Sequence, residues 1–132
     1  MNYIGSTRSN YFAVKDLEAY KAFLAQFGDV ELIESEADQG LVGFVMGKYS
    51  DSGCLPNTKG PDNDECDFIA ELAQHLADGE VAIVIEIGYE GARYLGGSAT
   101  AVNNQGELVT INTDSIYDLA KGLGTKITRA EG

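Results

Sequence analysis

Carboxylates are the side chains whose number and placement could carry chemistry in this sequence. The 132 residues include 21 Asp and Glu against 9 Lys and Arg, a net charge of −12. Residues 29–90 hold fifteen acidic and two basic residues, a net of −13, whereas residues 1–28 have a net of +1 and residues 91–132 a net of 0. Such a surface repels nucleic acids and anionic membranes and attracts cations or basic protein surfaces. The segregated charge favours a basic protein as the partner, with solubility as the alternative explanation.

Two groups of acids are the residues that we expect to contact this partner. One group follows a predicted hairpin and the other surrounds the start of a predicted helix. The full set is Glu31, Glu34, Glu36, Asp38, Asp62, Asp64, Glu65, Asp67 and Glu71. To imitate a nucleic-acid backbone, these carboxylates must project outward in a band. Each group also has a structural explanation, because acids protect a sheet edge from aggregation and complement a helix dipole.

The sequence shows no catalytic or metal-binding cluster. A nucleophile and base pair would need His75, the only histidine, or an activated lysine near a Ser or Cys, and no spacing suggests one. His75 lies off the apolar stripe of its helix, which favours a surface position. Cys54 and Cys66 lack the paired spacing of zinc ligands, and DNDECD at 62–67 departs from the calcium-loop order. We expect no catalytic residue, metal or cofactor, and interpret both cysteines as free thiols, with a disulfide as the alternative.

Residues 80–112 form the predicted centre of the fold. Val81–Ile87 is an almost unbroken apolar run, and two further stretches follow it after turns at 88–91 and 103–106. Because only short turns separate these stretches, they predict three antiparallel strands. A strand as apolar as the first needs cover on both faces, which places it in the middle of a sheet.

The first of these turns also fixes a register. If it has four residues, Glu86 lies opposite Arg93 as a cross-strand ion pair. The strand after Arg93 is rich in small residues, which allow a helix or a partner backbone to approach closely. These are Gly96, Gly97, Ser98, Ala99 and Ala101. We favour a helix of the same chain there.

Three amphipathic helices are predicted around these strands. The first begins after Asp16 and ends at Gly28, and its buried positions are Leu17, Tyr20, Phe23, Leu24 and Phe27. The second begins after Asn63 or Asp64 and runs through Ala77. The third begins after Thr113 or Asp114 and runs through Leu123, and its inward-facing positions are Ile116, Leu119, Ala120 and Leu123.

Three more strands are predicted before the centre, at 10–14, 30–35 and 41–46, and the last two form a hairpin at an edge of the sheet. Residues 47–63 are long, polar and broken by Gly and Pro, so we expect them to be the least packed internal segment. The order of elements is β-α-β-β-α-β-β-β-α. It predicts one α+β domain over 1–132, a sandwich of an antiparallel sheet with three helices mainly on one face.

Two stretches resemble a family of small acidic proteins of unassigned function that phages, plasmids and conjugative elements carry. These are SNYFAVKDLEAYKAFL at 9–24 and GYEGARYLGGSATAVNNQGELVTINTDSIYDLA at 88–120. The resemblance implies a protein that binds host defence machinery, such as restriction or CRISPR complexes, including as a mimic of DNA charge. The expected partner is then the basic surface of a host nucleic-acid-binding protein, with no direct contact to nucleic acid or membrane. The sequence leaves the oligomeric state open.

VKDLEAYKAFLAQFG at 14–28 also resembles the opening β-α unit of the glyoxalase (vicinal oxygen chelate) superfamily, which implies βαβββ modules and a metal held by His and Glu. The alternative function is therefore a small-molecule binder or enzyme, with Glu86, Arg93 and the 47–63 segment lining a pocket. The N-terminal residues show no signal peptide and no segment has the length of a membrane span, so we expect a cytoplasmic protein.

Overall fold

Six antiparallel strands form the main sheet of the computed structural model, which describes residues 4–47 and 55–131. The strands are β1 (Ile4–Ser9), β2 (Val30–Glu34), β3 (Val42–Met46), β6 (Val81–Glu90), β7 (Tyr94–Asn103) and β8 (Leu108–Asn112), and β4 (Thr58–Lys59) pairs with β5 (Asp64–Glu65) in a separate two-stranded sheet. The helices are α1 (Leu17–Leu24), α2 (Phe68–His75) and α3 (Ser115–Leu119), and the 3-10 turn η1 (Ala120–Gly122) follows α3. The predicted α+β class is confirmed.

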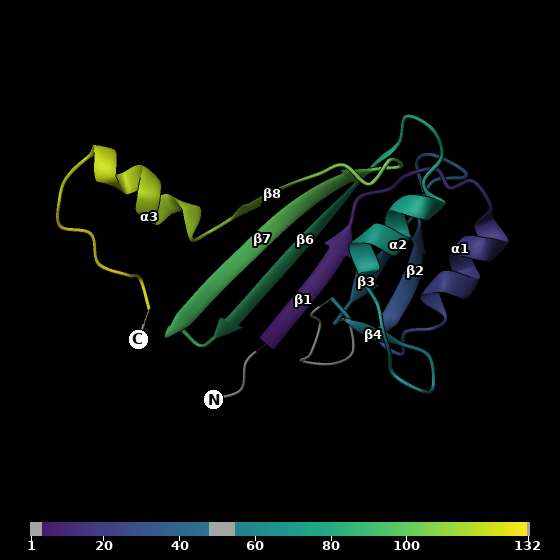
Figure 1. The fold of residues 1–132 in the computed structure, drawn as a ribbon, viewed down its shortest axis with the longest axis horizontal. Helices are drawn as coiled ribbons and strands as arrows, with labels where there is room; N and C mark the ends of the chain where they lie inside the picture. The colour runs from purple at the N-terminus through teal and green to yellow at the C-terminus, as the bar shows by residue number, and fades with distance from the viewer. Residues whose placement is uncertain (1–3, 48–54, 132) are drawn as a thin grey trace.

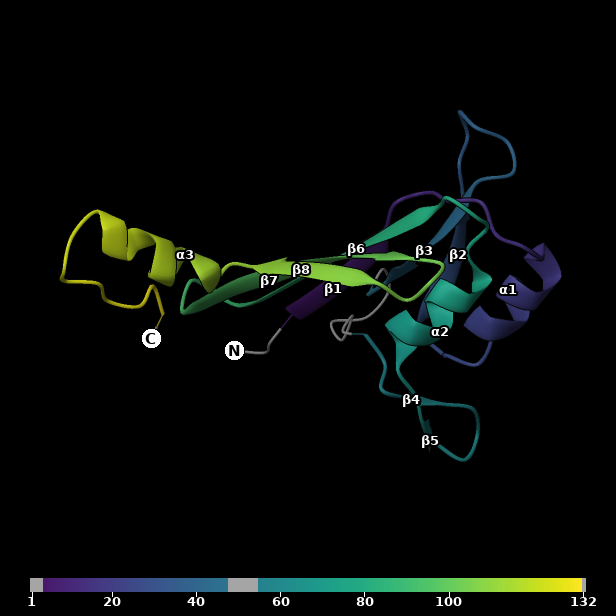
Figure 2. The same cartoon turned by 45° about the horizontal axis from the view of Figure 1, so that its top comes forward.

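The strands of the main sheet lie in the order β2-β3-β1-β6-β7-β8. Helices α1 and α2 cover one face at one end of the sheet, as Figures 1 and 2 show. We call this part of the molecule the helical body. β6 and β7 are ten residues long and extend beyond it. The far ends of β6 and β7, together with β8 and α3, extend away from the helical body (Figure 1).

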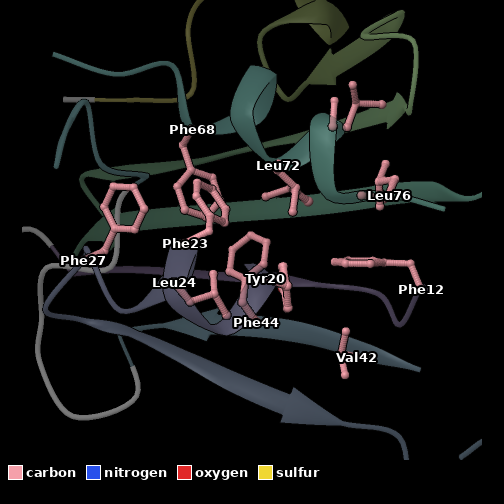
Figure 3. Close-up of a cluster of buried hydrophobic side chains, with 14 of the residues drawn as sticks. Phe12, Tyr20, Phe23, Leu24, Phe27, Val42, Phe44, Phe68, Leu72 and Leu76 are labelled. Carbon is pink, nitrogen blue, oxygen red and sulfur yellow. The ribbon is translucent and has the colours of Figure 1, made fainter. Parts of the chain in front are cut away.

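An aromatic core holds α1 and α2 against the sheet. Phe68 of α2 lies 5.1 Å from Phe44 of β3 and 5.2 Å from Phe23 of α1, measured between ring centroids. Figure 3 shows these rings meeting between the helices and the strands. The Asp16 side chain caps α1 by accepting from the N–H groups of Glu18 and Ala19, as predicted. Most of the apolar stripe predicted for α1 is buried, and Phe68, Leu72 and Leu76 are buried in and beside α2.

The first strand lies earlier than predicted. β1 comprises Ile4–Ser9, between β3 and β6, whereas residues 10–14 make only isolated bridges, from Phe12 to Val42 and from Val14 to Leu76. The prediction failed because most residues of β1 are small or polar, so the strand lacks an apolar pattern. Its buried positions are Gly5, Thr7 and Ser9, and its stability comes from backbone pairing with two neighbours rather than from apolar side chains.

The start of α2 also differs from the prediction. Asp67 is the N-cap, and its side chain accepts from the Ala70 N–H at 3.2 Å, so Asn63 and Asp64 do not cap the helix. Asp64 instead lies opposite Lys59 in the backbone pairing of the β4–β5 hairpin. That hairpin takes up residues that the sequence pattern assigned to an unstructured segment. Residues 48–54 of that segment, including Cys54, lie outside the described residues.

The predicted register between β6 and β7 is wrong. Glu86 pairs with Ser98, and the strands continue until Glu90 pairs with Tyr94. The turn therefore lies at residues 91–93, where Gly91 has a φ of 55° and the Arg93 N–H donates to the Glu90 carbonyl. The second predicted turn is confirmed, since the Gly106 N–H donates to the Asn103 carbonyl at 3.1 Å. The predicted edge position of β2 is confirmed as well.

Two predictions about burial are wrong for the described part of the chain. β6 is covered on one face only, because Ala82 and Val84 are buried while the alternating residues from Val81 to Tyr89 are exposed. The α3 stripe does not face inward, since Ile116, Leu119 and Leu123 are also exposed. Both errors have one cause, which is that α3 lies beyond the sheet rather than on it (Figures 1 and 2).

Candidate functional site: two acidic groups on the helical body

The first acidic group lies on β2 and on the loop between β2 and β3. It consists of Glu31, Glu34, Glu36 and Asp38. The last three are exposed, and Glu31 is half-buried. The turn is built locally, because the Ser35 Oγ accepts from the Asp38 N–H at 3.0 Å and the Asp38 carbonyl accepts from the Leu41 N–H at 3.3 Å. Within the described ranges, no ion pair includes Glu34, Glu36 or Asp38. These three carboxylates are open to a partner.

The second acidic group lies on the β4–β5 hairpin and at the start of α2. Asp62, Asp64 and Glu65 are exposed, and none of them forms an ion pair with another described residue. Asn63 adopts a φ of 52° at the tip of the hairpin. The Cys66 N–H donates to the Asn57 carbonyl at 2.9 Å and anchors the end of the hairpin. The hairpin therefore holds three carboxylates outward from the helical body.

Asp67 and Glu71 have structural roles that separate them from the other acids. Asp67 caps α2, and the half-buried Glu71 accepts a hydrogen bond from the Lys59 ammonium. That hydrogen bond raises the pKa of Lys59. Cys66 is a free thiol beside this pair, and desolvation, followed by the charge of Glu71, raises its pKa. Lys59 is the only basic residue of 29–90 within the described part. A single lysine among so many acids predicts an ion pair with one of them, and this contact with Glu71 was not identified from the sequence.

The exposed acids of the two groups occupy opposite ends of the helical body, whereas the half-buried Glu31 lies near the start of β2. Figure 2 shows the loop between β2 and β3 rising above the sheet, and the β4–β5 hairpin extending in the opposite direction below α2. Figure 1 shows the same separation. The carboxylates therefore form two patches with the body between them rather than one continuous band. A partner that contacts both must present basic residues on two sides of a groove.

The residues of the small-molecule alternative do not converge. Glu86 lines a polar hollow of about 300 Å³ together with Thr7, Tyr94 and Ser98, and Arg93 is not part of its wall. The described part of the 47–63 segment lines a different hollow, beside Gln26. No three His, Cys, Asp or Glu side chains lie close enough to hold a metal ion in 4–47 and 55–131.

His75 lies at the edge of the core. Its ring stacks on Phe23 with 4.8 Å between centroids and meets Tyr20 edge-on at 6.1 Å. The expected surface position is therefore only part of its environment, because the half-buried ring also packs on the core. Burial lowers the pKa of His75 below its usual 6.5, against the opposing charges of Glu71 and Asp16 and with a smaller lowering effect of Lys15. The neutral ring is the form that fits the folded protein.

Acidification is therefore expected to reduce stability through His75. Above about pH 6.5 the ring is neutral in both states and has no effect. As the pH falls below that value, the unfolded chain takes up a proton that the folded protein does not, so the free energy of unfolding decreases until the lowered folded pKa is passed. Urea unfolding at about pH 7 and pH 5 checks this. The decrease on acidification should be smaller in His75→Gln, and an identical decrease in both proteins would contradict it.

These observations define an α+β protein with exposed carboxylates on two hairpins and, among its described residues, no metal cluster. No described helix is long and apolar enough to cross a membrane. Comparison of the chain with models of protein families, with curated proteins and with solved structures gives no match.

Proposed function

We propose that the protein binds and inhibits a basic, nucleic-acid-binding protein or complex by occupying its nucleic-acid site with carboxylates. The observation that carries the proposal is the exposure of six acids without an ion-pair partner in the described ranges: Glu34, Glu36 and Asp38 on one hairpin, and Asp62, Asp64 and Glu65 on the other. A basic groove that binds a duplex carries cations on both of its sides, and the two acidic groups match that arrangement.

The type of partner follows from the charge and from the resemblance to proteins of mobile genetic elements. A net charge of −13 over 29–90 disfavours a nucleic acid as the ligand, because like charges repel. Restriction and CRISPR complexes are host proteins with basic grooves that such elements must evade. The proposal therefore assigns the protein to the anti-CRISPR or anti-restriction type. Asp67 and Glu71 are engaged in the helix cap and in the contact with Lys59, and Glu31 is half-buried, so these three acids are less open to the partner than the other six.

Neutralising either group is expected to weaken inhibition. One variant carries Glu34→Gln, Glu36→Gln and Asp38→Asn, and the other carries Asp62→Asn, Asp64→Asn and Glu65→Gln. The probes are purified restriction and CRISPR effector complexes, and the measurement is their DNA binding with and without this protein, across a salt series. Each variant should slow association by roughly tenfold at low salt, and by less at high salt, because exposed charges act mainly on the association rate.

A matched control removes the same number of charges outside the helical body, through Glu90→Gln, Glu107→Gln and Asp118→Asn. It should leave inhibition close to that of the natural sequence if position rather than total charge matters. Circular dichroism confirms that every variant folds, since exposed charge changes alter stability by only ~0.5 kcal/mol. Inhibition that is unchanged in both body variants at all salt concentrations, or absence of inhibition of every complex tested, would reject the proposal.

A further inference from the structure

The outer face of the sheet, opposite α1 and α2, is apolar along β6, β7 and β8, with Arg8 of β1 beside Ile85 at its margin, and no described helix covers it. Along β6 every second side chain points to this face, and these side chains are 40–56% exposed. The pairing register places neighbours from β7 and β8 beside them on the same face. The exposed apolar residues of this face are Val81, Ile83, Ile85, Ile87, Tyr89, Leu95, Val109 and Ile111. We call them the outer face.

The outer face is larger than a monomer normally leaves open. At roughly 170 Å² for a fully exposed side chain of this size, its eight residues expose on the order of 700 Å². Single patches on soluble monomers are usually ~300–600 Å², and each partner in a stable dimer buries ~800 Å². The outer face alone therefore supplies most of the area that a dimer needs.

The outer face also has the shape to receive a helix. Gly97 and Ala99 of β7 lie between the larger side chains of β6 and β8, so the side-chain surface forms a shallow groove over β7. A hollow of about 290 Å³ opens there, and Ile85, Ile87 and Ile111 are among the residues that line it. Small residues flanked by branched ones let a helix approach the backbone closely. No described helix of the same chain lies in this position (Figure 2).

α3 carries the complementary surface. Ile116, Leu119 and Leu123 recur at helical spacing and are 58%, 72% and 93% exposed. The chain end covers the other side of α3, where the Tyr117 hydroxyl accepts from the Ala130 N–H and Arg129 lies 4.4 Å over the Tyr117 ring. The apolar stripe of α3 is thus exposed, while the Tyr117 side of the helix is in contact with the chain end.

The connection between β8 and α3 directs the helix away from its own outer face. The Thr113 N–H donates to the Gly97 carbonyl at 2.9 Å, and the Thr113 Oγ1 accepts from the Gly97 N–H at 3.3 Å. The Asn112 side chain then accepts from the Ser115 N–H at 3.1 Å. These bonds hold the start of α3 beyond the end of β8, where Figure 1 shows it clear of the sheet. An isolated helix of this length is unstable in water without an apolar surface to pack on.

The charge distribution favours an identical chain as the occupant. Two copies with a net charge of −12 repel one another unless their acidic parts stay apart. Residues 91–132, which form β7, β8 and α3, have a net charge of 0. None of the eight residues of the outer face is charged. The contact would therefore be made by the uncharged side chains of β6 together with β7, β8 and α3, and not by the hairpins that carry the acidic groups.

We propose that a second copy of this chain covers the outer face through a two-fold axis, with the α3 stripe of each copy in the hollow of the other. Two-fold symmetry makes this arrangement closed, because each copy gives one stripe and receives one. The pair buries both apolar surfaces at once and leaves the acidic groups free. It concerns assembly and does not depend on the proposed inhibitory function.

The test is the solution mass by sedimentation equilibrium over a dilution series. The natural sequence should give twice the chain mass of 14.1 kDa. Leu119→Asp in the stripe and Ile85→Asp on the outer face should each lower the association constant by roughly 30-fold or more, because each buries a charge in the contact. Leu17→Asp, at a similarly exposed apolar position on α1, should have no effect. Circular dichroism shows whether each variant folds.

Mixing the two contact variants distinguishes a lost contact from a damaged fold. In a pair of one Leu119→Asp chain and one Ile85→Asp chain, one of the two stripe–face contacts has both natural surfaces. The mixture should therefore associate more strongly than either variant alone. A natural sequence that is monomeric at all concentrations, dimers that survive both variants, or a mixture no stronger than its components would each overturn the proposal. Loss of binding to an inhibited complex in Ile85→Asp, with a monomeric natural protein, would instead assign the face to that complex.

Discussion

Phe44→Ala is expected to lower the free energy of unfolding by ~3–5 kcal/mol, the largest effect of any single change considered. Phe44 is 0% exposed, and its ring meets Phe68 of α2 at 5.1 Å. β3 is paired with β2 on one side and with β1 on the other. The backbone is therefore held in place and cannot move inward to fill the cavity that the lost ring leaves. Urea unfolding followed by circular dichroism measures the change.

Leu17→Ala is the control for this experiment. Leu17 is the first residue of α1 and is 39% exposed, so its truncation removes less buried area and puts a better helix former at that position. Its cost should stay within about 1 kcal/mol. Equal losses for the two variants would show that the core does not rest on the contact between β3 and α2.

Gly43→Ala is expected to destabilise the protein by ~2–3 kcal/mol, although it adds only one methyl group. An added Cβ would lie 2.5 Å from the Asn10 carbonyl oxygen and 2.6 Å from the Ser9 Oγ. Neither atom is free to move, because the Ser9 Oγ donates to Asn10 and accepts from the Phe44 N–H at 2.9 Å. The Gly43 carbonyl also accepts from the buried Tyr20 hydroxyl, so a shifted backbone strains that bond.

Gly28→Ala provides the matched comparison, because nothing lies within 4 Å of its added Cβ. Removing a glycine there reduces the freedom of the unfolded chain, so stability should be unchanged or higher by up to ~1 kcal/mol. The difference in urea midpoint between the two variants measures the close packing at Gly43. A Gly43→Ala protein as stable as Gly28→Ala would mean that β3 and the Ser9–Asn10 backbone lie farther apart than described.

The parts of the fold that were predictable from the sequence have local causes. Asp16 caps α1 because its side chain reaches N–H groups two and three residues ahead. The 103–106 turn follows from the Asn103 side chain and Gly106 in the same way. Each of these contacts lies within a few residues of chain, so the residue types are enough to define it.

The failed predictions depend on contacts between distant residues. β1 is a central strand whose side chains are mostly small or polar, so only its neighbours identify it. The apolar run of β6 correctly signalled a need for cover, but a sequence pattern does not say which molecule supplies the cover. The acids of the candidate site were recognised by charge. Their division into two groups depends on how the two hairpins are mounted on the helical body (Figure 2).

The separation of the acidic helical body from the neutral β7–β8–α3 part gives each chain a large electric dipole moment along its long axis (Figure 1). A positively charged partner exerts a torque on such a molecule before the two touch. Within about a Debye length, ~8 Å at physiological ionic strength, the approaching protein is turned so that its negative pole leads. In a two-fold pair the moments of the copies oppose one another in part. Such a pair would present a negative pole at both ends and could be captured by either.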